Sequence, residues 1–203
     1  MIEIKDLTKH FGTHKVLDKL NLTIETGSTC VIIGRSGCGK SVLLKHIVGI
    51  LQAQSGQVLV DGKDIAELNE KELDTLRLKI GLVFQGGALF DSLTVGENVG
   101  FGLIEHTKIG RKELLERIEE ALSLVDLGGI VNLTPAELSG GMKKRVALAR
   151  AICIKPDIIL YDEPTTGVLI NFISLISPTS TPANLTGAPI FRPLAKLKIK
   201  LTS

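Results

Sequence analysis

The sequence predicts an α/β fold, with short strands at the start of the chain and helices in its middle. The run TCVIIG over residues 29–34 is almost entirely apolar, which is typical of a strand covered on both faces. It leads directly into a glycine-rich segment. Further along, RKELLERIEEALSLV over residues 111–125 repeats its apolar residues at a helical spacing. With 203 residues, the chain is expected to form a single domain.

Composition narrows the class of protein. The chain is 44% apolar and 23% charged, close to the averages of globular proteins. Its net charge of +2 gives no electrostatic reason to expect a nucleic-acid partner. No apolar run approaches the roughly 18 residues of a membrane-spanning helix, and the first residues are too charged for a signal peptide. Cys30, Cys38 and Cys153 are an odd number without a CxxC pair, which indicates reduced thiols in a cytosolic protein.

The other elements follow in chain order. Strand-like runs over residues 1–8 and 16–24 precede the apolar strand. Asn69 and Glu72 suggest the cap of a helix that starts at residue 70. The helix over residues 111–125 is expected to bury one face and to end before two glycines. That face consists of Leu114, Leu115, Ile118, Ala121, Leu122 and Val125.

The glycine-rich segment GRSGCGKS, residues 34–41, predicts a phosphate-binding loop. Gly34, Gly39, Lys40 and Ser41 fit the pattern G-x-x-x-x-G-K-[ST]. Glycines let successive backbone N–H groups converge on an anion, and the following helix adds its positive end. Lys40 can reach the β- and γ-phosphates, and the Ser41 hydroxyl can bind Mg²⁺. The alternative is a glycine-rich turn that merely starts a helix.

A second anion site is predicted near residue 139. Residues 134–137, Thr-Pro-Ala-Glu, resemble a capping box with proline at the first helical position. Ser139 can then cap another helix, and Gly140 and Gly141 leave its end bare. Two phosphate-binding helix starts in one chain favour a dimer in which each nucleotide lies between one site from each copy. Taken alone, these residues would describe an ordinary capped helix.

The segment DIILYDEP, residues 157–164, reads as a buried strand that ends in two adjacent carboxylates. Successive side chains point to opposite sides of a strand. One of the two carboxylates, Asp162 or Glu163, can therefore face a metal ion while the other faces a nucleophile. Phosphoryl transfer mainly requires positioning and charge neutralisation, which these groups provide.

Together these motifs resemble the nucleotide-binding domain of ABC transporters over residues 1–167. GRSGCGKS resembles the Walker A loop, LSGGM the signature motif, DIILYDEP the Walker B strand and LVFQGGALF the Q-loop. The resemblance implies an α/β P-loop NTPase fold of the ABC ATPase type, which is C-terminally incomplete here. Such a fold has a mixed sheet core, antiparallel N-terminal strands and a helical subdomain, here at about residues 86–155.

The resemblance also implies ATP and Mg²⁺ as cofactors and a role for each matched residue. Glu163 would act as general base, with Gln85 touching Mg²⁺ or the attacking water. Ser41 and Asp162 would complete the metal site. The nucleotide-binding residues would be Phe11, Gly34, Arg35, Ser36, Gly37, Cys38, Gly39, Lys40, Ser41, Val42, Ser139, Gly140 and Gly141. Phe11 stands where the family stacks a ring on adenine; by itself it would read as a half-buried edge residue.

Two segments resemble, in sequence, the ATPases of a subfamily of lipid importers, the maintenance-of-lipid-asymmetry type. These segments are FQGGALFDSLTVGENVGFGL and LSGGMKKRVALARAI. The resemblance implies a head-to-tail dimer, an integral membrane permease and a lipid-binding partner protein. It also implies a peripheral position on the cytoplasmic face of the inner membrane. Amino-acid and metal-ion importers lack the GGALFDSLTV wording.

The resemblance ends at Gly167. The family continues with Leu-Asp-Pro, where this chain has Val168, Leu169 and Ile170, and no histidine follows His106 to serve as the family's γ-phosphate sensor. Residues 168–203 hold four of the seven prolines and are expected to be irregular or disordered. We expect a truncated or frameshifted product, with a genuine short variant as the alternative.

Two other functions stay open on the sequence. One is a nucleotide-binding module that does not turn over, either a regulator or an inactive fragment. The other is a soluble ABC protein of translation or repair. Proteins of that class usually carry two such domains or a long insertion, and this chain shows neither.

Overall fold

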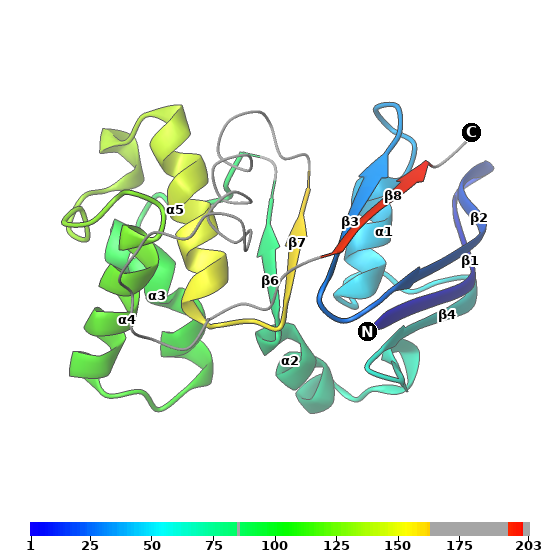
Figure 1. Ribbon diagram of the computed structural model, residues 1–203, viewed down its shortest axis with the longest axis horizontal. Helices are drawn as coiled ribbons and strands as arrows, with labels where there is room; N and C mark the ends of the chain where they lie inside the picture. The colour runs from blue at the N-terminus through cyan, green and yellow to red at the C-terminus, as the bar shows by residue number, and fades with distance from the viewer. Residues whose placement is uncertain (85, 163–194, 201–203) are drawn as a thin grey trace. The chain divides into compact units, whose positions relative to one another are not determined.

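The computed structural model describes residues 1–84, 86–162 and 195–200, which form two compact units (Figure 1). The first unit contains Met1–Leu73 together with a strand near the C-terminus. The second begins at Asp74 and holds the described residues as far as Asp162. Each unit is described by itself below.

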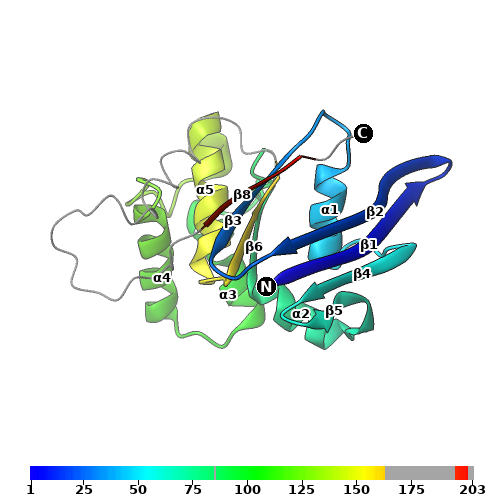
Figure 2. The same cartoon turned by 45° about the vertical axis from the view of Figure 1, so that its right-hand side comes forward.

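An antiparallel sheet of four strands dominates the first unit, in the order β2-β1-β4-β5 (Figure 2). Its strands are β1 (Ile2–Phe11), β2 (His14–Ile24), β4 (Ser55–Val60) and β5 (Lys63–Asp64). Ile4 of β1 pairs with Leu22 on one side and Val58 on the other, and all three side chains are buried. The expected antiparallel N-terminal strands are therefore present, because alternate apolar residues give the sheet one buried face.

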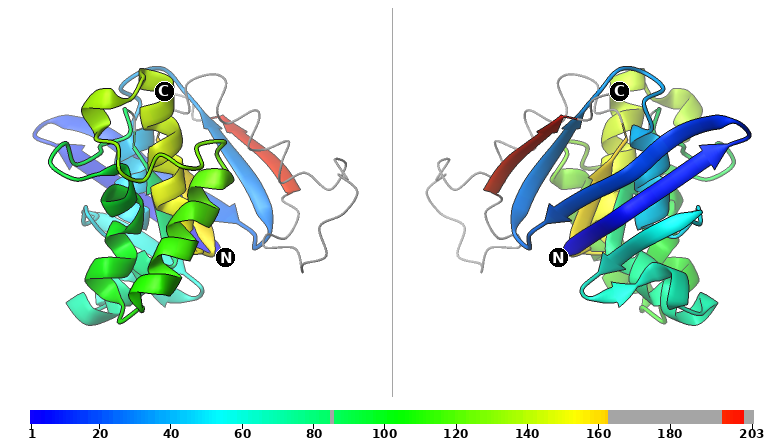
Figure 3. Two further views of the ribbon diagram at one scale, coloured as in Figure 1. Left: turned by 90° about the vertical axis from the view of Figure 1, so that its left-hand side faces the viewer. Right: turned by 90° about the vertical axis from the view of Figure 1, so that its right-hand side faces the viewer.

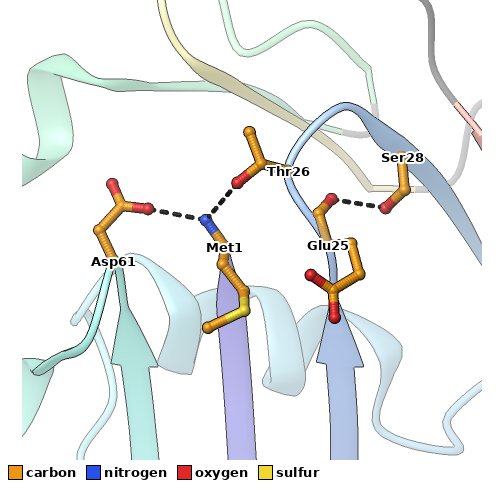
Figure 4. Close-up of polar contacts among 5 residues, drawn as sticks. All are labelled: Met1, Glu25, Thr26, Ser28 and Asp61. Carbon is orange, nitrogen blue, oxygen red and sulfur yellow. Dashed lines mark hydrogen bonds and ion pairs between the residues drawn. The ribbon is translucent and has the colours of Figure 1, made fainter.

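Polar contacts join three segments at the start of this sheet (Figure 4). The Met1 ammonium group donates to Asp61 Oδ1 at 2.7 Å and to Thr26 Oγ1 at 3.0 Å. The Ser28 hydroxyl donates to the Glu25 carbonyl at 2.6 Å and closes the turn before the next strand. These groups are exposed, so each contact contributes at most about 1 kcal/mol to stability.

Strand β3 (Ser28–Ile33) leads into helix α1 (Lys40–Ile47), as the glycine-rich motif predicts. The sequence predicts a strand covered on both faces, but within the first unit one face is left open. Val31 and Ile33 share one face and are 43% and 54% exposed. The described residues of the first unit do not cover that face, and an apolar run does not specify which neighbours will pack against it.

Residues 195–200 form strand β8 (Ala195–Lys200), which pairs in parallel with β3 from Ser28↔Ala195 to Ile33↔Lys200. For these six residues the structure differs from the irregular tail expected from the sequence. The overlooked signal is the alternation of lysine with leucine or isoleucine over residues 196–200, a spacing of two that favours a strand. The expectations for residues 168–194 lie outside the described residues.

In the second unit, β6 (Ile80–Val83) pairs in parallel with β7 (Ile158–Tyr161). Three helices pack on one another beside this pair (Figure 3): α3 (Val95–His106), α4 (Arg111–Ser123) and α5 (Gly140–Cys153). The remaining described helices are the 3₁₀ turn η2 (Pro135–Glu137) of the second unit, the 3₁₀ turn η1 (Ile65–Glu67) of the first unit, and α2 (Glu70–Leu78), whose residues up to Leu73 belong to the first unit.

The helices largely follow their predicted patterns. Asn69 and Glu72 exchange hydrogen bonds of 3.0 Å at the start of α2, which confirms that cap. In α4, Ile118, Ala121 and Leu122 are buried as expected. Leu115 is 48% exposed, so its assignment to the buried face is wrong. None of the helices in the described ranges combines the length and apolar character needed to cross a bilayer.

Candidate functional site

The loop between β3 and α1 is folded around the side chain of Lys40. Its ammonium group donates to the carbonyl oxygens of Gly34 at 3.0 Å and Arg35 at 2.9 Å. Gly37 and Gly39 have φ values of 78° and 99°, a left-handed conformation that favours glycine. The glycines of the motif therefore let the loop backbone turn so that two of its carbonyl oxygens face the Lys40 ammonium group.

Close packing fixes this loop in place. A Cβ atom on Gly34 would overlap the Sγ of Cys38. A Cβ on Gly39 would lie 2.9 Å from Val16 Cγ1 and 3.1 Å from the Val16 carbonyl oxygen, on the neighbouring strand β2. Side chains at these two glycines would therefore displace the loop.

The start of α1 suits an anion. Its N-cap residue, Gly39, offers no side-chain cap, and its first turn contains no acidic residue. Backbone N–H groups at such an end attract negative charge, which the helix dipole reinforces. Ser41 and Val42 belong to this first turn, and Arg35, Ser36 and Gly37 are exposed around it. A phosphate would fit here and could take over the Lys40 ammonium from the loop carbonyls.

Phe11 ends strand β1 with 48% of its surface exposed, enough for a flat base to stack on it. The Lys9 ammonium lies 5.4 Å from the ring centroid and donates to the Gln52 carbonyl at 2.8 Å. Next to it, the Gln54 amide exchanges hydrogen bonds of 2.9 and 3.0 Å with the main chain of His10. The strand end that carries Phe11 is thus anchored from a neighbouring segment.

Ser139 is the N-cap of α5, and its Oγ accepts from the Met142 backbone N–H at 3.3 Å. Gly140 and Gly141 are exposed, and a Cβ on either would meet no atom within 4 Å. Just before them, Glu137 accepts from the Thr134 N–H at 2.7 Å, and this hydrogen bonding lowers the Glu137 pKa. The predicted caps are therefore confirmed, and the helix start faces open space.

At the end of β7, the Asp162 backbone N–H donates to the Val83 carbonyl at 2.9 Å. The side chain of Asp162 is partly buried there. Burial raises the pKa of Tyr161, the last strand residue. The two predicted catalytic residues, Glu163 and Gln85, lie outside the described residues. Of the expected carboxylate pair, the structure thus describes only Asp162, the member predicted to bind the metal ion.

The predicted residues are divided between the two units. Phe11 and the phosphate loop belong to the first unit, whereas Ser139 and Asp162 belong to the second. Within the first unit, the residues of the phosphate loop gather around the Lys40 ammonium group.

Two residues of the second unit escaped the sequence reasoning. Arg150 of α5 donates two hydrogen bonds to the loop after Gln85, and Asn98 of α3 is completely buried and bonded to the end of the same loop. The sequence offered a signal for each of them. Arg150 is the one cation within the apolar stretch VALARAI, and Asn98 is the one amide within VGENVGFGL. Polar residues inside buried helix faces usually have a defined partner.

Comparison with known proteins shows the family. The ABC transporter family matches residues 17–166. A solved structure described as the dimeric structure of MJ0796, a bacterial ABC transporter cassette, is 34% identical with a TM-score of 0.80. The match covers 87% of this chain and 81% of that one.

Three curated relatives have different described cargoes. A probable ribonucleotide transport ATP-binding protein of Mycobacterium leprae is 46% identical over 82% of this chain and 48% of its own length. An intermembrane phospholipid transport ATP-binding protein of Haemophilus influenzae is 44% identical over 82% and 63%. An Fe(3+) import ATP-binding protein of Escherichia coli K12 is 40% identical over 84% and 47%. The chain therefore spans about half to two thirds of these relatives.

Proposed function

The chain belongs to the ABC transporter family of ATPases, and we propose that it is an ATP-binding subunit that drives phospholipid transport through a membrane permease. One observation carries the nucleotide part. The Lys40 ammonium group donates to two loop carbonyls, those of Gly34 and Arg35, beside the uncapped start of α1. A nucleotide phosphate would replace those carbonyls and gain the helix N–H groups at the same time.

In this proposal the chain's own residues share the work of hydrolysis. Lys40 neutralises the β- and γ-phosphates, and Phe11 stacks on the adenine. Ser41, Gln85 and Asp162 hold Mg²⁺, since hydroxyl, amide and carboxylate oxygens are the ligands that this ion prefers. Glu163 orients and deprotonates the attacking water. Bound Mg²⁺ supplies neutralisation of phosphate charge.

A second copy of the chain completes each site in this proposal. The bare start of α5, with Ser139 and Gly141, would contact the γ-phosphate held by the phosphate loop of the partner copy. Open space at Gly140 and Gly141 supports this, because an anion can approach without a steric barrier. The dimeric cassette that the chain is similar to is consistent with such an arrangement.

The proposal of a phospholipid cargo rests on the sequence similarity of two segments to lipid importers and on the described cargo of one relative. The Haemophilus influenzae relative is described as the ATP-binding protein of an intermembrane phospholipid transport system, whereas the names of two others refer to ribonucleotide or iron transport. A permease and a lipid-binding protein would then be the partners, with the chain on the cytoplasmic face of the inner membrane. Cargo is selected by those partners, so the test must include a permease.

A second candidate function is nucleotide binding without turnover. It is favoured by Leu169, which stands where the family has its dimer-contacting aspartate, and by the absence of any histidine after His106. Both functions share the nucleotide site and differ in hydrolysis.

Two measurements test the proposal. Binding of a fluorescent ATP analogue should be saturable in the wild-type chain and absent in Lys40→Ala. Co-expression with permeases of phospholipid and of iron importers should then give a complex with the former only. In a version whose residues after Gly167 come from a full-length relative, the ATP turnover of that complex in vesicles should rise with phospholipid. A stable complex with the iron permease alone would contradict the cargo but not the nucleotide site.

A further inference from the structure

The loop that follows Gln85 is fixed to α5 by the guanidinium group of Arg150. Nη2 donates to the Gly87 carbonyl and Nη1 to the Ala88 carbonyl, both at 2.8 Å. Arg150 lies in the last turn of α5, and burial lowers its pKa, although an arginine stays protonated at neutral pH. Hydrogen bonds from a charged donor in a partly buried site are among the stronger ones.

The loop needs such a restraint because its backbone is unusual. Gly86, Gly87 and Ala88 have φ values of 80°, 86° and 44°, three left-handed residues in succession. A residue with a Cβ atom rarely adopts this conformation, so Ala88 is held there by its surroundings. A Cβ on Gly87 would lie 3.2 Å from the Lys143 carbonyl oxygen, which places this part of the loop directly against α5.

The other end of the loop is fixed by α3. Asn98 is fully buried, and its Oδ1 accepts from the Phe90 N–H at 2.8 Å. Its Nδ2 lies 3.0 to 3.2 Å from the carbonyl oxygens of Phe90, Leu93 and Thr94. Both ends of the stretch are therefore restrained, and Arg150 restrains the end nearer to residue 85.

The helix that carries Arg150 is also the helix that begins at Ser139. Eleven residues separate the two, or about 16 Å along a rigid helix. We propose that Arg150 is a positioning residue of the nucleotide site, which fixes the main chain after Gln85 to the helix of the signature motif. Through this link, the loop that begins at Gly86 has a defined position relative to α5, and it is this loop that follows the proposed Mg²⁺ ligand Gln85. The inference rests on the proposed function, because the role of Gln85 does.

A purely structural role for Arg150 is the competing explanation, and the chain offers a matched control. Arg145 lies on the same helix and also donates to two carbonyl oxygens, those of Val125 at 3.1 Å and Asp126 at 3.3 Å. Those carbonyls belong to the segment after α4 and not to the loop after Gln85. Arg145→Ala therefore removes similar bonds from the same helix without freeing the loop.

The first measurement is amide hydrogen exchange on the purified chain. In Arg150→Ala, the peptide over residues 86–92 should exchange about tenfold faster than in the wild type, since the bonds that order it are gone. Arg150→Lys should restore part of the protection, because one ammonium can replace one of the two hydrogen bonds. Arg145→Ala should leave this peptide unchanged. Equal exchange in Arg150→Ala and wild type would overturn the inference, as would equal acceleration in Arg145→Ala.

The second measurement compares ATP affinity in Mg²⁺ and in EDTA. In EDTA, the ATP affinity of Arg150→Ala should stay within about twofold of the wild-type value. The increase in ATP affinity that Mg²⁺ causes should be smaller than in the wild type by about threefold or more, because one Mg²⁺ ligand, Gln85, would be misplaced. Arg145→Ala should behave as wild type. Equal Mg²⁺ dependence in the two variants would refute the positioning role. If even the wild type binds no ATP, the proposed function fails, while the exchange experiment still decides whether Arg150 orders the loop.

Discussion

The ammonium group of Lys9 lies 5.4 Å from the ring centroid of Phe11 and is tied to the Gln52 carbonyl by a hydrogen bond of 2.8 Å. Both side chains come from strand β1, two residues apart, so they project from the same side of the strand. The cation occupies one face of the ring. A nucleotide base would therefore stack on the face that Lys9 leaves open.

This arrangement predicts the effect of removing the ring. Phe11→Ala should weaken ATP binding about tenfold, since base–aromatic stacking contributes roughly 1–3 kcal/mol. Phe11→Trp should retain most of the affinity because it keeps an aromatic face. Titration with a fluorescent ATP analogue measures both. Ile50→Ala, another exposed apolar residue of the same unit, serves as the control, and an equal loss there would contradict a specific role for Phe11.

The phosphate loop and the general base predict opposite consequences for binding. Lys40→Ala should abolish ATP binding, because the ammonium neutralises phosphate already in the ground state. Glu163→Gln should bind ATP with nearly unchanged affinity, since that carboxylate acts on water only as the bond breaks. The two affinities are measured by equilibrium dialysis. A loss in Glu163→Gln as severe as in Lys40→Ala would show that the assigned roles are wrong.

The reactivity of the cysteines toward thiol reagents can report whether phosphates occupy the phosphate loop. Cys38 lies inside the loop with its Sγ 3.9 Å from the Lys40 ammonium, so bound phosphates should shield it from thiol reagents. Cys153 is buried, and burial raises the pKa of its thiol to about 11, which makes it an unreactive internal reference. Alkylation followed by mass spectrometry should show slower labelling of Cys38 in saturating Mg-ATP. Equal labelling with and without nucleotide would place the phosphates elsewhere.

Substitution of the buried residue Asn98 is expected to reduce the stability of the protein strongly. Asn98→Ala should lower the free energy of unfolding by about 2–4 kcal/mol, because it leaves the Phe90 N–H and nearby carbonyls unsatisfied. Asn98→Asp should be at least as harmful, since a carboxylate would face carbonyl oxygens to which the amide now donates. Urea unfolding measures both. A change below about 0.5 kcal/mol would mean that water replaces the amide.

The sequence was sufficient to predict those parts of the structure that depend on residues close together in the chain. The glycines and Lys40 follow one another within eight residues, so the loop that they form could be predicted from the sequence. The contact of Arg150 with Gly87 joins residues 63 positions apart, and no local pattern announces it. The same limit applies to β3, where the apolar run indicated a strand, but its exposed Val31 and Ile33 depend on elements elsewhere in the chain.

The last prediction concerns hydrolysis by the chain as it stands. Leu169 replaces the family's dimer-contacting aspartate and no histidine follows His106, so the expected γ-phosphate sensor has no candidate. Loss of one such group typically slows a reaction by about 10²–10⁴-fold. Turnover should therefore be near background even if ATP binds. The measurement compares Mg-ATP turnover of this chain with a version whose residues after Gly167 come from a full-length relative. Glu163→Gln in the replaced version controls for contaminating ATPases. Equal turnover of the two chains, both abolished by that substitution, would show that residues 168–203 supply the missing groups themselves.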